Sequence, residues 1–206
     1  KKLRIELEQS IKDTEFLLGQ DYGVMERLEQ EDYQVAGQAK YIDQYGGYPI
    51  YENSDAKYYP SGEAMFEELI EDLKKAKHYI FMEFFIVSRG YMWDTILEVL
   101  KDRVNDGVEV RFMYDDVGCV DLLPYKYYKE LERFGIMAMP FNPIKPFVST
   151  AWNNRDHRKI LFIDGKVAFT GGINLADEYM NIVERFGYWK DTGVMLKGDA
   201  VRSFTL

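Results

Sequence analysis

Residues 157–170 read HRKILFIDGKVAFT, and this stretch decides the predicted fold. Residues 160–163 are apolar and rich in strand-forming types, and Asp164 and Gly165 follow them directly. An Asp-Gly pair between two apolar runs is a strong signal for a two-residue β-hairpin. We therefore predict two antiparallel strands, the second over residues 166–170.

The residues before the first of these strands carry reactive groups. Because side chains two apart on a strand share a face, His157 and Lys159 should lie together, with Arg158 on the other side. A nucleophile or base beside a fixed cation is suited to attack on a phosphate. Taken singly, each residue has an ordinary explanation, since a histidine at a strand edge is more often structural and a lysine more often lies on the surface.

Two glycines follow the second strand. Gly171 and Gly172 would let the backbone approach a ligand closely. Asn174 precedes a predicted helix at about 175–183, and the first N–H groups of a helix can receive an anion. The alternatives are a simple bend at the glycines and a plain N-cap at Asn174. Because a nucleophile, a cation and an anion site occur together, we favour a site that handles phosphate.

The pattern His157-x-Lys159-x4-Asp164, with Gly-Gly-x-Asn after it, resembles the HKD motif of the phospholipase D superfamily. The resemblance covers residues 35–206. Within it, four flanking segments are similar, in the same order, to segments of bacterial cardiolipin synthases: 58–63 (YYPSGE), 82–85 (MEFF), 110–118 (VRFMYDDVG) and 186–192 (FGYWKDT).

The resemblance implies that His157, Lys159 and Asp164 are catalytic. It also implies phosphate-binding or supporting roles for six further residues: Asn174, Gly171, Gly172, Glu83, Asp116 and Asp191. Among these, Asp191 is the candidate that hydrogen-bonds to the imidazole of His157 and orients it, with Glu184 as a weaker alternative. Gly193 stands where the synthases most often have histidine, so no role is carried over to that position.

Carboxylates also stand on two predicted strands. Glu83 lies within residues 79–87, an almost unbroken apolar run that predicts a strand buried on both faces. A buried ionised carboxylate needs a partner, so Glu83 is either half of a structural ion pair or part of the site. Asp115 and Asp116 end a strand predicted over residues 108–114. Carboxylates at that end of a strand often face a site, and capping of a loop is the alternative.

The chain alternates strands and helices. This alternation predicts an α/β fold, a mixed β-sheet with helices on both faces, in which the hairpin supplies the antiparallel pair. The predicted helices lie at about 61–77, 93–104, 122–134 and 175–183, and the further strands at 79–87, 108–114, 136–141 and 188–197. Residues 1–40 are predicted to form a helical appendage and linker, and residues 41–206 the phospholipase D-like domain with a single HKD motif.

Composition sets limits on function. With 206 residues and 47% hydrophobic content, the chain suits one globular domain with an appendage. The single cysteine, Cys119, excludes a disulfide within the chain. A net charge of −9 argues against broad binding of nucleic acid, so none is expected as a partner. The chain has no apolar run of bilayer-spanning length, so we expect it to be soluble as written.

Only one HKD pattern occurs, and the other histidine, His78, lacks it. The synthases that the chain resembles carry two HKD halves, with the active site between them, and begin with membrane-spanning helices. The resemblance thus implies one half of a two-lobed enzyme, the N-terminal one. Its partner would be the second half of the same polypeptide or a homodimer mate. The enzyme would be attached to the bacterial cell membrane through segments absent from this chain, with the catalytic domain on the cytoplasmic side.

The implied reaction transfers a phosphatidyl group between two phosphatidylglycerol molecules through a phosphohistidine, with release of glycerol. Lys159 and Asn174 would bind the nonbridging oxygens of the phosphate. Cationic side chains take the place of a metal in this scheme, so no metal and no other cofactor is expected. The alternatives are a phosphodiesterase or nuclease of the same superfamily, and a non-catalytic lipid-binding half-domain.

Overall fold

The computed structural model describes residues 18–144 and 154–205. Seven strands form one mixed sheet in the order β1-β7-β6-β5-β2-β3-β4. The elements follow one another as α2 (Tyr22–Glu31), α3 (Tyr33–Gly46), β1 (Ser54–Tyr59), α4 (Gly62–Lys74), β2 (Tyr79–Phe84), α5 (Tyr91–Asn105), β3 (Glu109–Asp115), α6 (Asp116–Cys119), α7 (Tyr127–Arg133), β4 (Met137–Phe141), β5 (Ile160–Ile163), β6 (Val167–Gly171), the 3-10 helix η3 (Asp177–Met180), β7 (Gly193–Gly198), the 3-10 helix η4 (Asp199–Val201) and α8 (Arg202–Thr205).

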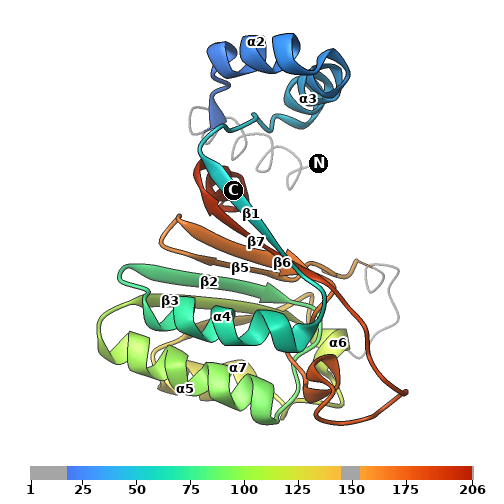
Figure 1. Cartoon of the computed structure of the whole chain (residues 1–206). Coiled ribbons are helices and arrows are strands. Elements are labelled where there is room, and N and C mark those ends of the chain that lie inside the picture. The colour runs from blue at the N-terminus through green and yellow to red at the C-terminus, as the bar shows by residue number, and fades with distance from the viewer. Residues whose placement is uncertain (1–17, 145–153, 206) are drawn as a thin grey trace. The chain divides into compact units, whose positions relative to one another are not determined.

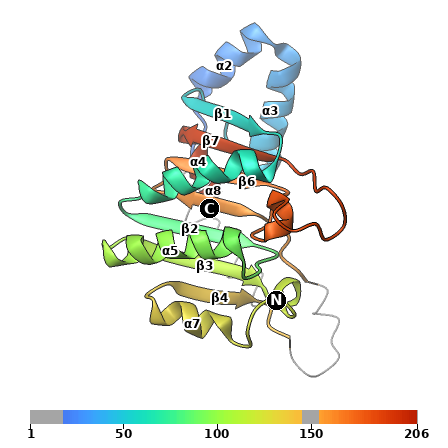
Figure 2. The ribbon, with the colours of Figure 1, turned by 60° about the horizontal axis from the view of Figure 1, so that its bottom comes forward.

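Helices flank this sheet, as the alternation in the sequence predicts. Figure 1 shows α4 and α5 lying against the strands, and Figure 2 shows α7 beside β4. Each helix turns an apolar stripe inward; Leu69 and Leu73 of α4 are completely buried, as is Trp93 of α5. The indole N–H of Trp93 donates to the hydroxyl of Tyr127 on α7, at 2.8 Å, so α5 and α7 share one core. The predicted mixed sheet with flanking helices is confirmed.

The hairpin forms where the sequence predicts it. Asp164 and Gly165 both have positive φ, 54° and 63°, as the two central residues of a type I′ turn require. β5 and β6 pair antiparallel, with Ile163 opposite Val167.

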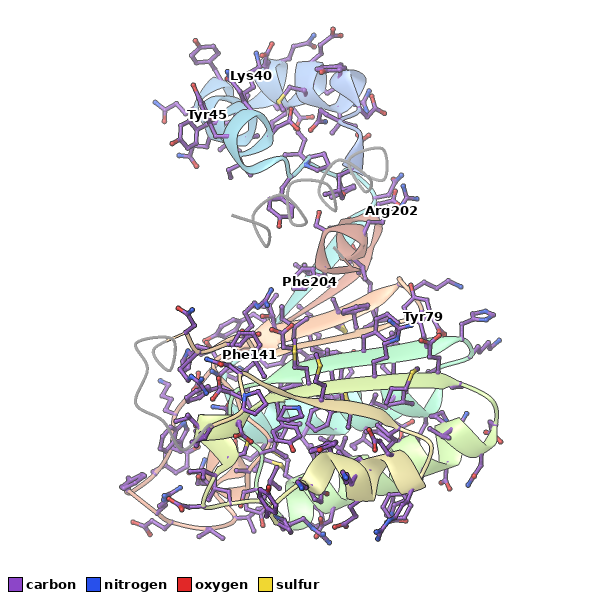
Figure 3. The ribbon with its side chains drawn as sticks, turned by 180° about the vertical axis from the view of Figure 1, so that it is seen from behind. Lys40, Tyr45, Tyr79, Phe141, Arg202 and Phe204 are labelled. Carbon is purple, nitrogen blue, oxygen red and sulfur yellow. The ribbon has the colours of Figure 1, made fainter. Side chains whose placement is uncertain are left out.

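Strand directions decide where the site is built. β2 runs parallel to β3, and β3 parallel to β4, whereas β5 runs antiparallel to β2. The carboxyl ends of β2, β3 and β4 therefore meet the amino end of β5 at the same end of the sheet. Figure 3 shows the two ends: Tyr79 begins β2 at one, and Phe141 ends β4 at the other. We call the end that carries Phe141 the site end.

The structure differs from the predicted elements at several positions, three of which concern the edge of the sheet and the segments after β6. β1 has no predicted counterpart, because most of its side chains are exposed and its sequence lacks an apolar alternation. The helix predicted at 175–183 is only the short η3, which ends at Asn181 in the left-handed region, at φ 54°. The carboxylate of Asp177 accepts from the N–H groups of Tyr91 and Met92 and so caps α5. β7 begins at Gly193, because the chain before it forms a loop.

Two compact units make up the described chain: residues 18–55 with 197–205, and residues 56–144 with 154–196. The predicted boundary at residue 40 would cut α3, which continues to Gly46. Residues 1–17 of the predicted helical appendage lie outside the described part of the chain. None of the helices in the described ranges combines the length and apolar character that crossing a bilayer requires.

Candidate active site

Five chain segments converge at the site end of the second unit. They are the residue after β2, the end of β3, the approach to β5, the turn after β6 and the approach to β7: Phe85, Asp115–Asp116, 155–159, 171–174 and 189–192. In Figures 1 and 2, α6 and the loop between η3 and β7 both lie at the end to which the arrows of β2 and β3 point.

The ring of Phe85 brings His157 and Lys159 together. The imidazole of His157 lies 4.7 Å from the Phe85 ring, centroid to centroid, and the ammonium of Lys159 lies 5.2 Å from the same centroid. The Lys159 Nζ also donates to the backbone carbonyl of His157, at 2.7 Å. Histidine and lysine thus share one side of the chain, as their spacing predicts, and the imidazole is exposed while the lysine is 5% exposed.

Burial changes the acidity of the lysine. Its stem lines a small cavity with apolar side chains of α4 and β2, among them Met65 and Phe84. This burial lowers the pKa of the Lys159 ammonium, because the charged form loses water. The carboxylates of Asp191 and Asp156 oppose the effect only in part. A cation with little water around it gives a strong electrostatic contact to an arriving anion.

Arg158 points to the other side of the chain and pairs with two carboxylates. Its guanidinium donates through Nε and Nη2 to the two carboxylate oxygens of Asp156, each at 3.0 Å. Its Nη2 also lies 2.7 Å from Oε1 of Glu83. The predicted site carboxylate Glu83 is thus half of an ion pair at the edge of the site, which is the structural alternative left open by the sequence.

The buried carboxylate of Asp115 holds the segment that precedes β5 in place. Its side chain is fully buried and accepts from the N–H groups of Val117 and Gly118, which caps α6. It also accepts from the guanidinium of Arg155, at 3.2 Å, and from the N–H of Asp156, at 3.1 Å. One carboxylate thereby fixes the backbone immediately before His157.

The neighbouring Asp116, which the sequence singled out, has a simpler set of contacts. Its Oδ2 accepts from the N–H of Ile144, at 2.8 Å, and so holds the chain after β4. This is the loop-capping alternative. A direct role of Asp116 toward a phosphate stays a prediction.

Gly171 and Gly172 lie so close to the approach to β7 that neither position has space for a side chain. A side chain on Gly171 would collide with the carbonyl oxygen of Thr192, and one on Gly172 with the carboxylate of Asp191. The Gly172 N–H donates to the Thr192 carbonyl, at 3.1 Å. The approach to β7 thus fills the space where side chains of these residues would lie, and close approach of a ligand to their backbone stays a prediction.

Asn174 is 2% exposed and joins two segments. Its Oδ1 accepts from the N–H of Ile86, at 2.9 Å, and its Nδ2 donates to the hydroxyl of Tyr179, at 2.8 Å. An amide nitrogen carries two hydrogens, so one donor of Asn174 lies outside these two bonds. Contact of that donor with a phosphate oxygen stays a prediction.

The carboxylate of Asp191 lies near the ammonium of Lys159 and makes no hydrogen bond to the imidazole of His157. Its carboxylate packs on Gly172 and acts on the charge of Lys159. Within residues 18–144 and 154–205, neither Asp191 nor Glu184 is hydrogen-bonded to the ring of His157. The orienting role predicted for Asp191 therefore has no bond in this structure to carry it.

Asp164 lies at the far end of the sheet. Its carboxylate accepts from three consecutive backbone N–H groups, those of Lys77, His78 and Tyr79, at 2.8–2.9 Å. Burial raises the pKa of this carboxyl, but the three donors outweigh burial, so the pKa lies below its usual value. In this structure β5 separates Asp164 from His157 and Lys159, and its catalytic role stays a prediction without a contact that supports it. Its role is to hold the start of β2 against the hairpin.

Sequence reasoning missed Phe85, Asp156 and the hub role of Asp115. Phe85 reads as one more apolar residue of a strand, and no local pattern marks it. The adjacent Asp115 and Asp116 were the only signal for a carboxylate here, and the fully buried one of the two is Asp115. In the described part of the chain, no cluster of three His, Cys, Asp or Glu side chains could hold a metal ion.

The comparison with protein families now bears on this site. Residues 69–186, more than half of the chain, match the family described as "Cardiolipin synthase, PLD-like domain". The chain belongs to this family. The matched range contains Phe85, Asp115, His157 and Lys159.

Full-length relatives extend the match. A protein of Streptococcus mutans, named only as uncharacterised, is 52% identical over 90% of this chain and 40% of its own length. The cardiolipin synthase of Geobacillus thermodenitrificans is 40% identical over 78% of this chain and 32% of its own length. The chain therefore spans 32% to 40% of the length of these two relatives.

Solved structures agree on the fold. NucT from Helicobacter pylori aligns with 74% of this chain and 91% of its own, with a TM-score of 0.55 and 13% identity. Nuc, a phospholipase D family member from Salmonella typhimurium, aligns with 75% of this chain and 90% of its own, with a TM-score of 0.52 and 17% identity. At these identities the likeness concerns the fold alone.

Proposed function

We propose that this chain carries the nucleophilic half of a phosphatidyl-transferring site, with His157 as the nucleophile and Lys159 as the cation that binds the phosphate. The observation that carries the proposal is the shared ring of Phe85, which holds an exposed imidazole and a buried ammonium side by side. Membership of the cardiolipin synthase family supports phosphatidylglycerol as the substrate.

In the first step, a ring nitrogen of His157 attacks the phosphorus of one phosphatidylglycerol. A P–N bond forms, the P–O bond to the glycerol headgroup breaks, and glycerol leaves after taking a proton. In the second step, the hydroxyl of a second phosphatidylglycerol attacks the same phosphorus and gives its proton to the group that protonated the glycerol. The P–N bond breaks, His157 is regenerated, and the product is cardiolipin. Lys159 neutralises the nonbridging oxygens, whose charge must be held in both transition states.

The proton for the leaving glycerol has to come from a second group. General acid catalysis needs a donor with a pKa near the working pH, and histidine is the usual one. The sequence offers His78, but it lies next to Tyr79, at the end of the sheet opposite the site. We therefore assign the acid to a second motif, supplied by a further segment of the same polypeptide or by a second copy of this chain.

Trapping of the covalent intermediate tests the proposal. A polypeptide that contains this chain together with the second motif is incubated with phosphatidylglycerol labelled at phosphorus, and the reaction is quenched in alkaline detergent, in which phosphohistidine survives. We expect label on the wild-type chain and on the His78→Asn variant, and none on the His157→Asn variant. Equal labelling of the two histidine variants would exclude His157 as the nucleophile. A parallel incubation with labelled DNA tests the nuclease alternative. A nuclease would cleave the DNA or take label from it, and it would leave the lipid intact.

A further inference from the structure

The ring of Phe85 belongs to a short loop between β2 and α5. We call residues 85–88 the Phe85 loop. Because the ring contacts both His157 and Lys159, whatever holds this loop in place also holds the nucleophile and the cation in relation to each other. The backbone groups of a buried loop need hydrogen-bond partners, and two other segments of the chain supply them here.

One side of the Phe85 loop pairs with the segment after β6. The N–H of Ile86 donates to the side-chain oxygen of Asn174, at 2.9 Å. The carbonyl of Ile86 accepts from the N–H of Leu175, at 3.1 Å, and the N–H of Ser88 donates to the carbonyl of Leu175, at 3.0 Å. Two further backbone groups of the loop, a carbonyl and an N–H, find their partner elsewhere.

That partner is the thiol of Cys119 on α6. Its sulfur accepts from the N–H of Val87, at 3.2 Å, and its S–H donates to the carbonyl of Phe85, at 3.6 Å. One side chain thus bridges two backbone groups of the Phe85 loop. Cys119 is 2% exposed, and burial raises the pKa of its thiol to about 12, so the sulfur keeps the proton that it donates.

The size of the sulfur atom suits this bridge. Hydrogen bonds of a hydroxyl group to oxygen are about 2.7–2.8 Å long, so a serine at position 119 would reach at most one of the two partners at a good distance. An alanine would reach neither. It would leave a buried N–H and a buried carbonyl without a partner, and such groups are costly. We therefore expect the two substitutions to loosen the Phe85 loop to different degrees.

The residue before the cysteine lets α6 come close to the same loop. A side chain on Gly118 would collide with the carbonyl oxygen of Phe85 and would come within 3.3 Å of its ring. The missing side chain permits the approach that brings the neighbouring sulfur into hydrogen-bond reach. Figure 1 shows α6 at the end of the sheet to which the arrow of β2 points, which is where the Phe85 loop begins.

The same short helix is connected to the histidine by a second route. Asp115 caps α6 and also accepts from the N–H of Asp156, the residue before His157. The carboxylate thus ties the backbone of the nucleophile to α6, and the thiol of Cys119 ties the Phe85 loop to it. Ring and imidazole are therefore positioned from one common support.

We propose that Cys119 is a positioning residue for the nucleophile: its thiol holds the Phe85 loop, so that the Phe85 ring keeps the His157 imidazole beside the Lys159 ammonium. The inference rests on the proposed function for the role of His157, but the arrangement that it describes needs no substrate. Cys119 is buried beneath the loop and acts on the site through the ring of Phe85.

Nuclear magnetic resonance of the imidazole rings tests the proposal without substrate. The 206-residue chain has two histidines, so its spectrum contains one imidazole at the site and one, His78, at the opposite end of the sheet as an internal reference. The ring current of Phe85 shifts the His157 signal, because the two rings lie 4.7 Å apart, centroid to centroid. Phe85→Leu removes this ring and gives the full displacement of the signal.

The cysteine variants are then placed on that scale. Cys119→Ala should move the His157 signal part of the way toward its position in Phe85→Leu. Cys119→Ser, which restores one of the two bonds, should move it less. The His78 signal should stay in place in all three variants, because its surroundings are unchanged.

Ile136→Val separates positioning from a general loss of stability. Ile136 is 1% exposed and directly precedes β4, at the end of the sheet away from the site. This variant should lower the free energy of unfolding and leave the His157 signal where it is. The proposal is wrong if that signal moves as far in Ile136→Val, or if it keeps its wild-type position in the cysteine variants. If Cys119→Ala does not fold, Cys119→Ser alone decides.

A second readout follows the covalent step. In a polypeptide that contains this chain and the second motif, Cys119→Ala should slow the labelling of His157 by roughly ten-fold, because a small misplacement of a reacting group can cost up to about a hundred-fold. The lipid concentration at half-maximal rate should stay the same. Labelling of Cys119→Ala at the wild-type rate would overturn the proposal. If the wild type itself takes up no label, the proposed function fails, and the imidazole spectra still decide on Cys119.

Discussion

The carboxylate of Asp191 occupies the space that Gly172 leaves by having no side chain. This contact joins the end of β6 to the approach to β7 and sets a negative charge close to the buried ammonium of Lys159. The glycine therefore serves the site indirectly, because it admits the carboxylate that partly compensates the lysine.

Gly172→Ala should disturb this arrangement. The added methyl group would overlap the Asp191 carboxylate, which must move, and overpacking of this kind costs roughly 1–3 kcal/mol of unfolding free energy. Gly37→Ala in α3 is the matched control, because nothing lies within contact distance of its new methyl group. In a helix that change should be neutral or stabilise by up to about 1 kcal/mol. Urea titrations that give both variants the same unfolding free energy as wild type would contradict the predicted overlap.

The buried ammonium of Lys159 should leave a signature in the pH dependence of stability. Burial lowers its pKa in the folded chain, whereas the unfolded chain keeps a value near about 10.4. Between the lowered pKa and the ordinary one, the unfolded chain binds more protons. Stability contributed by this residue therefore rises with pH in that window.

Lys159→Met, of similar size, removes the titrating group and should remove that rise. The quantity to follow is the unfolding free energy of wild type minus that of the variant, from neutral pH to about pH 10. Tyrosine titrations are common to both proteins and cancel. A difference that stays level or falls with increasing pH would show that the ammonium is not deprived of water in the folded chain.

Local signals in the sequence sufficed for the strands and the hairpin. The apolar runs of β2 and β3 and the Asp164-Gly165 turn need only neighbouring residues, so their positions were predictable. β1 was not, because its exposed side chains follow no apolar pattern. Nor was the contact by which Asp177 of η3 caps α5, because the two elements lie far apart in the sequence.

In the site, too, the features set by neighbouring residues were predictable, and those set by distant segments were not. A period of two predicted that His157 and Lys159 share a side, and the structure agrees. The ring that contacts both, Phe85, directly follows another strand, β2, and the pairing of strands across a sheet cannot be read from one segment. Asp164 completes the sequence pattern of the motif, yet its side chain serves the hairpin at the other end of β5.

Asp164 should therefore be a stability residue. In Asp164→Asn, one acceptor oxygen becomes a donor that faces backbone N–H groups, and we expect a loss of about 2–3 kcal/mol at neutral pH. Because the pKa of the carboxyl is lower in the folded chain than in the unfolded one, its contribution is complete above the unfolded pKa and is lost as pH falls through the folded pKa. The difference between wild type and variant should shrink in acid. Asp121→Asn, at an exposed position, is the control and should cost little at any pH.

Asp115 should act as a positioning residue for the nucleophile. In Asp115→Asn, the amide oxygen can still cap α6 through Val117 and Gly118, but the amide nitrogen then faces the N–H of Asp156. The charge that holds Arg155 is also lost. We expect the backbone before His157 to loosen while the fold survives, at a cost of roughly 1–3 kcal/mol.

Hydrogen exchange distinguishes this positioning role from a general loss of stability. In Asp115→Asn, the amide of Asp156 should exchange at least about ten-fold faster, since it loses its acceptor, while the amides of β2 and β3 change only by the global effect. Labelling of His157 by phosphatidylglycerol should fall in parallel, although the histidine itself is unaltered. The control is Asp116→Asn, which removes the neighbouring negative charge. The only described hydrogen bond of the Asp116 carboxylate is to the Ile144 N–H, so this variant should leave the Asp156 amide protected. If both variants expose that amide equally, the approach to β5 is held by the sheet and not by the Asp115 carboxylate.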